Sequence, residues 1–249
     1  MASRCESMPK SVTLKILRSG PSKPHYQNFT LTISEQMRLI DALHRIKLEQ
    51  DPSLGYTYSC DGRKRCGTCA MMINDKPRLA CFTALERNVT IEPLRGFPAI
   101  QDLIIDRSTY EKKIQAIQPA VSSSGDDGDL DQADRESQAL SHCIECLCCQ
   151  AACPVASKET WKKFAGPTIF VQLGKVSFNP RDRADRPQIA MDQGIHNCDK
   201  CYECEKTCPV SIEIVHAIER LQQSARSNAL EPGTRSPKAF VELLEGRIS

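Results

Sequence analysis

Two stretches of the chain share one cysteine pattern: CIECLCCQAACP at residues 143–154 and CDKCYECEKTCP at residues 198–209. Each fits the form C-x2-C-x2-C-x3-C-P, the ligand pattern of bacterial iron–sulfur ferredoxins. The spacing therefore predicts two cubane-type clusters. Structural zinc is the alternative, but zinc sites rarely repeat a four-cysteine run that ends in proline.

In two-cluster ferredoxins the first three cysteines of a run bind one cluster and the fourth binds the other. The predicted ligand sets are Cys143, Cys146, Cys149 and Cys208 for one cluster, and Cys198, Cys201, Cys204 and Cys153 for the second. His142 and His196 stand beside these cysteines, and histidine ligates iron in Rieske-type centres. Because every expected ligand position is already cysteine, we expect both histidines to hydrogen-bond near a cluster or to face solvent.

A third cysteine group lies in SCDGRKRCGTC at residues 59–69. The plant-type [2Fe–2S] pattern is C-x4-C-x2-C with a distant fourth cysteine. The chain matches it at Cys60, Cys66, Cys69 and Cys81, with one extra residue between the first two, which we expect to bulge the loop. Gly62 and Gly67 permit close approach of the backbone to a cluster. The alternative is four core cysteines beside solvated basic residues.

Apolar periodicity around this loop indicates the fold of the first half. Alternating apolar residues over 12–16 and 29–33 predict a β-hairpin. Helical spacing over 39–46 predicts a helix with Ser34 as its N-cap. Apolar residues 70–73 are followed by a predicted turn at Asn74-Asp75. Strands around one packed helix predict a β-grasp core.

The second half reads as helical. Tyr110, Ile114 and Ile117 recur at helical spacing, and a second apolar stripe lies at residues 214–221. Residues 122–137, rich in Ser, Gly and Asp, predict an exposed loop. The predicted fold class is α+β, with an N-terminal β-grasp (plant-type ferredoxin) domain at residues 1–105 and a C-terminal all-α, bacterial-ferredoxin-like domain at residues 106–249.

Composition narrows the class of protein. Fourteen cysteines in 249 residues would suit a secreted disulfide scaffold, but the chain starts without an apolar signal segment and its cysteines cluster at ligand spacings. We therefore expect a reducing compartment. A formal net charge of +2, with bases and acids interspersed, argues against a nucleic-acid binder. No apolar run approaches the roughly 20 residues that span a bilayer.

A plant-type loop followed by two ferredoxin runs resembles the iron–sulfur subunit of the succinate dehydrogenase and fumarate reductase family, over nearly the whole chain. Further matches are LIDAL at 39–43 with DPSL at 51–54, QDLIID at 101–106 and CLCC at 146–149. The resemblance implies single-electron transfer between an FAD-containing flavoprotein subunit and a membrane-anchor subunit. It implies no catalytic residue for succinate chemistry in this chain, and no assigned role for Cys148; we assign none to Cys5 either.

Two departures from the common family pattern are informative. Cys201 stands where most members have an aliphatic residue and a [3Fe–4S] centre, so the resemblance to the minority branch with this cysteine predicts a second [4Fe–4S] cluster, with [3Fe–4S] as the alternative. Ser157, Lys158 and Asp199 stand where the common quinone site has a tryptophan pair and a histidine. Trp161 is expected to pack with Phe164, a quinone role being the alternative.

These departures imply an unusual anchor, cysteine-rich and related to heterodisulfide reductases, rather than haem-binding. The basic triplet Arg63-Lys64-Arg65 either attracts the surface of the flavoprotein to the [2Fe–2S] loop or is merely solvated. We expect a prokaryotic chain at the cytoplasmic face of the inner membrane, peripheral through its partner. Two alternatives are the iron–sulfur subunit of another flavin-linked dehydrogenase and a free polyferredoxin, which the net charge of +2 disfavours.

Overall fold

The computed structural model describes residues 10–20, 23–33, 36–60, 62–123, 135–156 and 159–230. The chain forms two compact units that are interleaved along the sequence. The first contains residues 1–109, 143–154 and 203–211; the second contains residues 110–142, 155–202 and 212–249. The predicted domain boundary at residue 105 stays a prediction. The two compact units are not two consecutive stretches of the chain, and each contains part of the second cysteine run.

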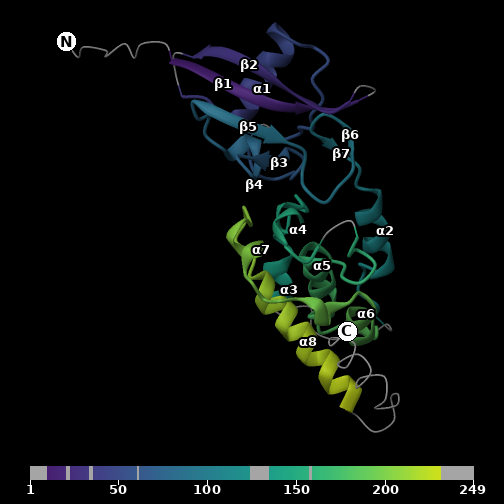
Figure 1. Ribbon diagram of the computed structural model, residues 1–249. Coiled ribbons are helices and arrows are strands. Elements are labelled where there is room, and N and C mark those ends of the chain that lie inside the picture. Colours follow the sequence, from purple (N-terminus) through teal and green to yellow (C-terminus); the bar gives the residue numbers. More distant parts are fainter. Residues whose placement is uncertain are drawn as a thin grey trace, which may run out of the picture. The chain divides into compact units, whose positions relative to one another are not determined.

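The first unit is built on a five-stranded sheet (Figure 1). Its strands, in spatial order, are β2 (His25–Ile33), β1 (Lys10–Arg18), β5 (Asn88–Glu92), β3 (Ala70–Ile73) and β4 (Lys76–Leu79). The β1–β5 pair is parallel and the other pairs are antiparallel. With α1 (Leu39–Glu49) against the sheet, this is the predicted β-grasp fold.

The period-2 alternation of the first hairpin explains its burial. Val12, Leu14 and Ile16 of β1 are at most 3% exposed, and Leu14 pairs with Phe29 of β2 in antiparallel register. The apolar stripe of α1 is buried as well: Leu39, Ile40, Leu43 and Ile46 are at most 2% exposed. The alternating apolar residues of the strands and the helically spaced ones of α1 are thus buried in one core. Burial of apolar surface is the dominant favourable term in folding.

The predicted N-cap of α1 is wrong. Ser34 lies outside the described residues, and the helix begins at Leu39 with Arg38 in the N-cap position. The Asp41 carboxylate accepts a hydrogen bond from the Arg38 backbone N–H at 3.1 Å. Leu39 N–H donates to the Thr83 carbonyl at 2.9 Å, so a tertiary contact satisfies one of the donors at the start of the helix.

Turns and short elements complete the first unit's N-terminal segment. The predicted turn is confirmed: Asn74 and Asp75 join β3 to β4 with φ of 48° and 64°, the left-handed pair that such two-residue hairpins need. η1 (Ala80–Phe82) follows β4, and β6 (Ala99–Gln101) pairs with β7 (Ile104–Ile105). Buried Asp102, 1% exposed, accepts hydrogen bonds from Arg18 and from the Gly55 N–H.

Two later segments join the first unit through short helices, α4 (Cys148–Ala152) and α7 (Glu203–Lys206). The two helices contact each other, and α4 contacts β4. The Thr207 hydroxyl donates to the Pro77 carbonyl at 2.7 Å. Segments from both cysteine runs therefore pack beside the sheet edge formed by β4.

The described elements of the second unit are helices: α2 (Ser108–Ala116, whose first two residues belong to the first unit), α3 (Arg135–Leu140), α5 (Pro167–Ser177), α6 (Arg186–Asp192), η3 (Ile195–Asn197) and α8 (Ile214–Leu230). The predicted stripe of α8 is buried, and α8 packs along α5 and α6 (Figure 1). Among the described helices of the whole chain, none combines the length and apolar character needed to cross a bilayer.

Two further predictions meet the structure in this unit. Residues 124–134 of the predicted exposed loop lie outside the described residues, and α3 begins at Arg135, so the loop prediction is wrong for residues 135–137. Trp161 and Phe164 are 5% and 1% exposed, and the Phe164 ring lies 5.6 Å from the Phe170 ring. Trp161 is thus buried in its unit, whereas its packing with Phe164 stays a prediction.

Candidate iron–sulfur sites

The first cysteine group surrounds the loop between α1 and β3. The side chains of Cys60 and Cys66 are hydrogen-bonded to each other, and the Cys81 N–H lies 3.5 Å from the Cys69 sulfur. The negative charge of the Cys66 thiolate contributes to raising the pKa of Cys69. Pairwise contacts thus link all four cysteines, from two intermediate positions at the loop surface to two that are at most 2% exposed.

Backbone N–H groups of this loop point at sulfur. Those of Arg65, Cys66 and Arg63 donate to Cys60, and they lower the pKa of its thiol to about 6. Burial raises the pKa of Cys69 to about 12. A ring of inward N–H groups is what an anionic iron–sulfur cluster requires of its loop, because hydrogen bonds to the sulfurs stabilise its charge.

Only a glycine fits at position 67, because the backbone of Ile144 lies very close to it. Its φ is +66°, and a Cβ there would lie 2.5 Å from the carbonyl oxygen of Ile144. The cysteine loop therefore packs directly on the start of the first ferredoxin run. Lys64 also has positive φ, at 52°, in the part of the loop with the extra residue; Asp61 lies outside the described residues.

The first ferredoxin run has a cysteine of the second run as its neighbour. Burial raises the pKa of Cys143 to about 11, with further contributions from the charges of Cys146 and Cys208. The hydrogen bond with Cys146, burial and the charges of Cys146, Cys149 and Cys208 raise the pKa of Cys148, and the same hydrogen bond lowers the pKa of Cys146. Four cysteines that bind one cubane in the crossed assignment thus lie within one compact unit.

The two runs share an unusual backbone. Glu145 and Lys200, each two residues after the first cysteine of its run, have φ of 50° and 53°. Leu147 and Tyr202, each following the second cysteine, have φ of 65° and 62°. Each first cysteine accepts a hydrogen bond from the N–H two residues later. Non-glycine residues rarely take this conformation, so its repetition marks two loops shaped for the same purpose.

The remaining predicted set is divided between the units. Cys198 and Cys201 belong to the second unit, where burial raises the pKa of Cys198; Cys153 and Cys204 belong to the first. Among the described residues, no group of three or more His, Cys, Asp or Glu is arranged to hold a single metal ion. The described cysteines of the two runs interact in pairs, within each run and, at Cys143 and Cys208, between the runs.

Residues that the sequence pattern did not single out also shape the sites. The Arg38 guanidinium donates to the carbonyls of Gly62 and Cys81 at 3.0 and 2.9 Å, which fastens the first loop to the helix start. Arg107 donates to the Glu145 carbonyl at 3.4 Å and its charge helps lower the pKa of Cys146. Contacts this distant in sequence leave no local signal.

The basic and histidine side chains near the cysteines take several positions. Arg63 and Arg65 are at least partly exposed, whereas Lys64 donates to the Pro209 carbonyl at 3.2 Å and lies over the exposed Phe82 ring. His142 is exposed, and His196 Nε2 lies 3.1 Å from the Asn197 amide nitrogen. Cys5, Ser157 and Lys158 lie outside the described residues.

Comparisons with known proteins agree with this organisation. Residues 13–112 match the model of a 2Fe-2S iron–sulfur cluster binding domain, and residues 139–212 match that of a 4Fe-4S dicluster domain. The cysteine sets have the donor chemistry and the inward N–H groups that such clusters need. Fold and sites define an iron–sulfur electron carrier with a plant-type ferredoxin part and a two-cluster part.

Relatives place this carrier in a family. The fumarate reductase iron–sulfur subunit of Mycobacterium tuberculosis is 30% identical, the match covering 90% of this chain and 96% of that protein. One chain in the structure of the Mycobacterium smegmatis Sdh1 complex in its apo form superposes with a TM-score of 0.81 at 27% identity, over 90% of this chain and 99% of that one. The chain belongs to the family of fumarate reductase and succinate dehydrogenase iron–sulfur subunits.

Longer relatives match as well. An uncharacterized iron–sulfur protein of Methanococcus maripaludis is 33% identical over 84% of this chain and 46% of its own length. A fumarate reductase (CoM/CoB) subunit of Methanothermobacter marburgensis is 32% identical over 86% of this chain and 44% of its own length. The chain therefore spans less than half the length of these relatives.

Proposed function

We propose that this chain is the electron-transfer subunit of a complex that oxidises succinate or reduces fumarate. The proposed clusters are one [2Fe–2S] on Cys60, Cys66, Cys69 and Cys81, one [4Fe–4S] on Cys143, Cys146, Cys149 and Cys208, and a third on Cys198, Cys201, Cys204 and Cys153. When bound, such clusters supply one-electron transfer. The chain holds them and sets their potentials, and it has no catalytic residue for succinate chemistry.

The observation that carries the proposal is the repeated cysteine loop. Both runs hold positive φ at matching positions, and Cys208 of the second run acts electrostatically on Cys143 of the first. The same constraint on both loops is explained by two anionic clusters that need N–H groups aimed at them. Two unrelated solvent-exposed loops have no reason to share it.

The third cluster is proposed to be a second [4Fe–4S], with [3Fe–4S] as the alternative. Cys201 is exposed, and the Tyr202 that follows it has the same left-handed backbone as Leu147 after Cys146. A cysteine in this loop position presents its thiolate as the ligand at Cys146 does, which supplies the fourth iron with a ligand.

The proposed partners are an FAD-containing flavoprotein subunit and a membrane-associated subunit that is quinone-linked, cysteine-rich or haem-binding. The exposed Asp199 stands where the common quinone site has histidine, and Trp161 is buried in the core of its unit. These observations favour a cysteine-rich acceptor. The proposed location is the cytoplasmic face of the inner membrane, peripheral through the partner.

The test is purification of the native complex in mild detergent, with partner chains identified by mass spectrometry and succinate-dependent dye reduction assayed on the same sample. Co-purification of a flavoprotein with succinate activity is expected. A flavoprotein without that activity would favour another flavin-linked dehydrogenase. A chain that purifies alone, with clusters and without activity, would contradict the proposal and indicate a free polyferredoxin.

A further inference from the structure

Arg107 is a half-buried cation beside the first ferredoxin run, in the same compact unit. It lies between β7 and α2, and its two neighbours in sequence are held by hydrogen bonds. The Asp106 N–H donates to the Pro98 carbonyl, and the Ser108 N–H donates to the Asp106 carboxylate, both at 2.8 Å. The side chain of Arg107 therefore starts from a fixed place in the unit.

The Arg107 guanidinium contacts the turn between the first two cysteines of the run. It donates to the Glu145 carbonyl at 3.4 Å. The Glu145 N–H donates to the Cys143 sulfur, and Glu145 has left-handed backbone with φ of 50°. Cys143 and Cys146, which flank this turn, are both proposed ligands. The turn thus offers an N–H to one ligand and a carbonyl to the arginine.

The charge of Arg107 also acts on the second cysteine of the run. Cys146 is 7% exposed. The hydrogen bond with Cys148 lowers the pKa of the Cys146 thiol, and the positive charge of Arg107 adds to this effect, although burial acts to raise the pKa. The thiolate is therefore favoured at this position, and the thiolate is the form that binds a metal.

Negative charge is concentrated in the same loop. Burial and the negative charges of Cys146, Cys208 and Glu145 raise the pKa of Cys143. Reduction would add one more negative charge to a cluster that four thiolates already make anionic. A cation close by lowers the free-energy cost of the added electron, and this attraction is less screened by salt when the cation is partly buried.

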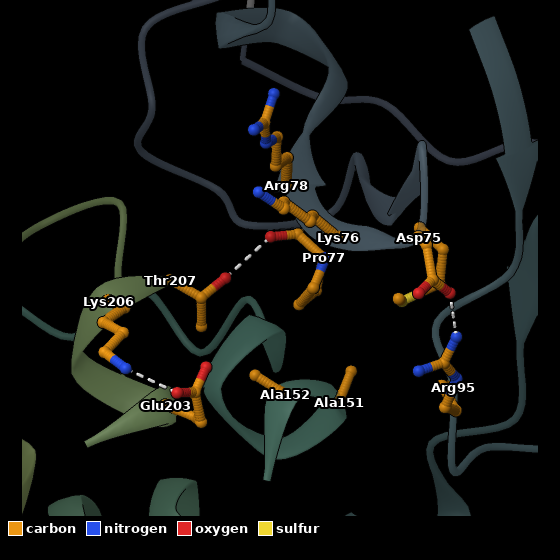
Figure 2. A pocket seen from close by; sticks show the side chains of 11 residues that line it. Asp75, Lys76, Pro77, Arg78, Arg95, Ala151, Ala152, Glu203, Lys206 and Thr207 are labelled. Atoms are coloured by element: carbon orange, nitrogen blue, oxygen red, sulfur yellow. Dashed lines mark hydrogen bonds and ion pairs between the residues drawn. The ribbon is translucent and has the colours of Figure 1, made fainter. Parts of the chain in front are cut away.

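The cysteine segments that Arg107 faces are held in place from other sides as well. A Cβ at Gly67 would lie 2.5 Å from the Ile144 carbonyl oxygen, so the [2Fe–2S] loop packs on the start of the same turn. The Thr207 hydroxyl donates to the Pro77 carbonyl at 2.7 Å (Figure 2). Because Thr207 directly precedes Cys208, this bond ties the fourth proposed ligand to β4. The guanidinium is therefore fixed relative to the proposed cluster.

We propose that the positive charge of Arg107 stabilises the negative charge of the [4Fe–4S] cluster on Cys143, Cys146, Cys149 and Cys208 and so raises its reduction potential. Net charge and hydrogen bonds around a cluster are among the quantities that set its potential. Arg107 is a positioning residue and not a ligand. A guanidinium suits this role because it stays protonated at all ordinary pH values. The inference rests on the proposed cysteine ligands.

The test is an EPR-monitored redox titration of the full-length, cluster-containing protein under anaerobic conditions. The variant R107Q keeps an N–H donor and removes the charge. We expect the equilibrium constant for reduction of one [4Fe–4S] cluster to fall at least threefold in this variant, or about 28 mV for one electron. R107K keeps the charge and should stay within twofold of the unmodified chain. The control R87Q removes an exposed arginine of the same unit and should leave every potential unchanged.

An unchanged potential in R107Q would overturn the inference, as would an equal fall in R107K or in R87Q. A [4Fe–4S] signal that R107Q loses and R107K keeps would support it, because both side chains donate hydrogen bonds and they differ in charge. Loss of the signal from both variants would overturn it, since Arg107 would then serve only to hold the turn.

The titration separates this inference from the proposed function. It needs no partner subunit, so its outcome does not depend on whether the complex turns over succinate. If the unmodified protein gave no [4Fe–4S] signal, the proposed clusters would be contradicted and the inference with them. If the signal is present and R107Q leaves its potential unchanged, only the role of Arg107 is refuted.

Discussion

At the scale of single residues, the sites depend on side chains and backbone angles that oppose ordinary preferences. Leu147 and Tyr202 hold left-handed backbone, which costs roughly 1 kcal/mol or more for a residue with a Cβ. Such strain persists where the surroundings require it. Glu145 and Lys200 are left-handed as well, and their N–H groups donate to the first cysteine of each run. We therefore attribute the strained backbone of both loops to cluster binding.

Cys201 should decide the type of the third cluster. In Cys201→Ile one iron would lack a thiolate, and we expect a strong [3Fe–4S] EPR signal in the oxidised variant that is absent from the unmodified protein. The matched control is Cys148→Ala, which removes a buried cysteine that the proposal gives no ligand role. A [3Fe–4S] signal in undamaged unmodified protein, or loss of a cluster in the control, would contradict the assignment.

At the scale of elements, the first cysteine loop and the first ferredoxin run are packed on each other within one unit. Gly67 lies where its missing side chain leaves room for the Ile144 carbonyl and the Cys146 backbone. Cys146 is itself a proposed ligand. The shape of one cluster loop thus bears directly on the position of another.

Gly67→Ala is expected to disrupt this contact. The methyl group would meet the Ile144 oxygen at 2.5 Å, on a backbone with φ of +66° that alanine disfavours by about 1 kcal/mol or more. We expect loss of [2Fe–2S] absorbance and a lower midpoint of thermal bleaching. The control Ser59→Ala, an exposed position in the same loop, should retain both. If Gly67→Ala keeps the [2Fe–2S] absorbance and the midpoint of thermal bleaching, the contact with Ile144 is not needed to hold the cluster.

In the second unit, α6 has an arginine in place of an apolar core residue. Arg186 is 2% exposed, donates to the carbonyls of Ile117, Gln118 and Ala120 at 2.7–2.8 Å, and pairs with Asp182. Burial acts to raise the pKa of Asp182, but hydrogen bonds from Arg186 and Ser122 outweigh it and the pKa lies below its usual value. The chain leaving α2 is thereby fixed to α6.

Arg186→Leu should be among the most destabilising single changes in this unit. It leaves three carbonyls and a buried carboxylate without their donor, a loss of about 3 to 5 kcal/mol. The measurement is urea-dependent proteolysis of the cluster-containing protein under anaerobic conditions. Lys112→Leu is the control, because Lys112 is exposed on α2, and its effect should stay within about 0.5 kcal/mol. Similar midpoints for the two variants would refute the role of Arg186.

At the scale of the whole molecule, the two compact units are not consecutive in sequence. Residues 143–154 and 203–211 belong with the N-terminal sheet, and the chain between them belongs with the helical unit. Each proposed cubane draws ligands from both cysteine runs. Cluster binding is therefore expected to contribute to the folding of both units, as metal binding does wherever ligands come from separate segments.

Removal of the clusters should loosen both units together. After anaerobic chelation, we expect limited proteolysis to cut the chain within both units, for example within residues 62–109 of the first and 159–202 of the second. The cluster-containing protein should resist at these positions under the same conditions. The control is the Cys148→Ala variant with clusters intact, which should resist as the unmodified protein does. An apoprotein whose two units stay resistant would show that the fold is independent of the clusters.

The sequence alone determined what is local. Cysteine spacing identified the three candidate cluster loops, because a ligand loop is read over a few residues, and apolar periodicity identified the hairpin and α1, because one buried face fixes the period. The exact start of α1 was missed, since the first helical N–H, that of Leu39, donates to the carbonyl of Thr83, which is distant in sequence.

Only the tertiary structure decided which distant residues meet. It brought Thr207 onto Pro77 and the carbonyls after α2 onto Arg186. None of these contacts has a sequence signature, because each joins segments far apart in the chain whose approach depends on the packing of the whole unit.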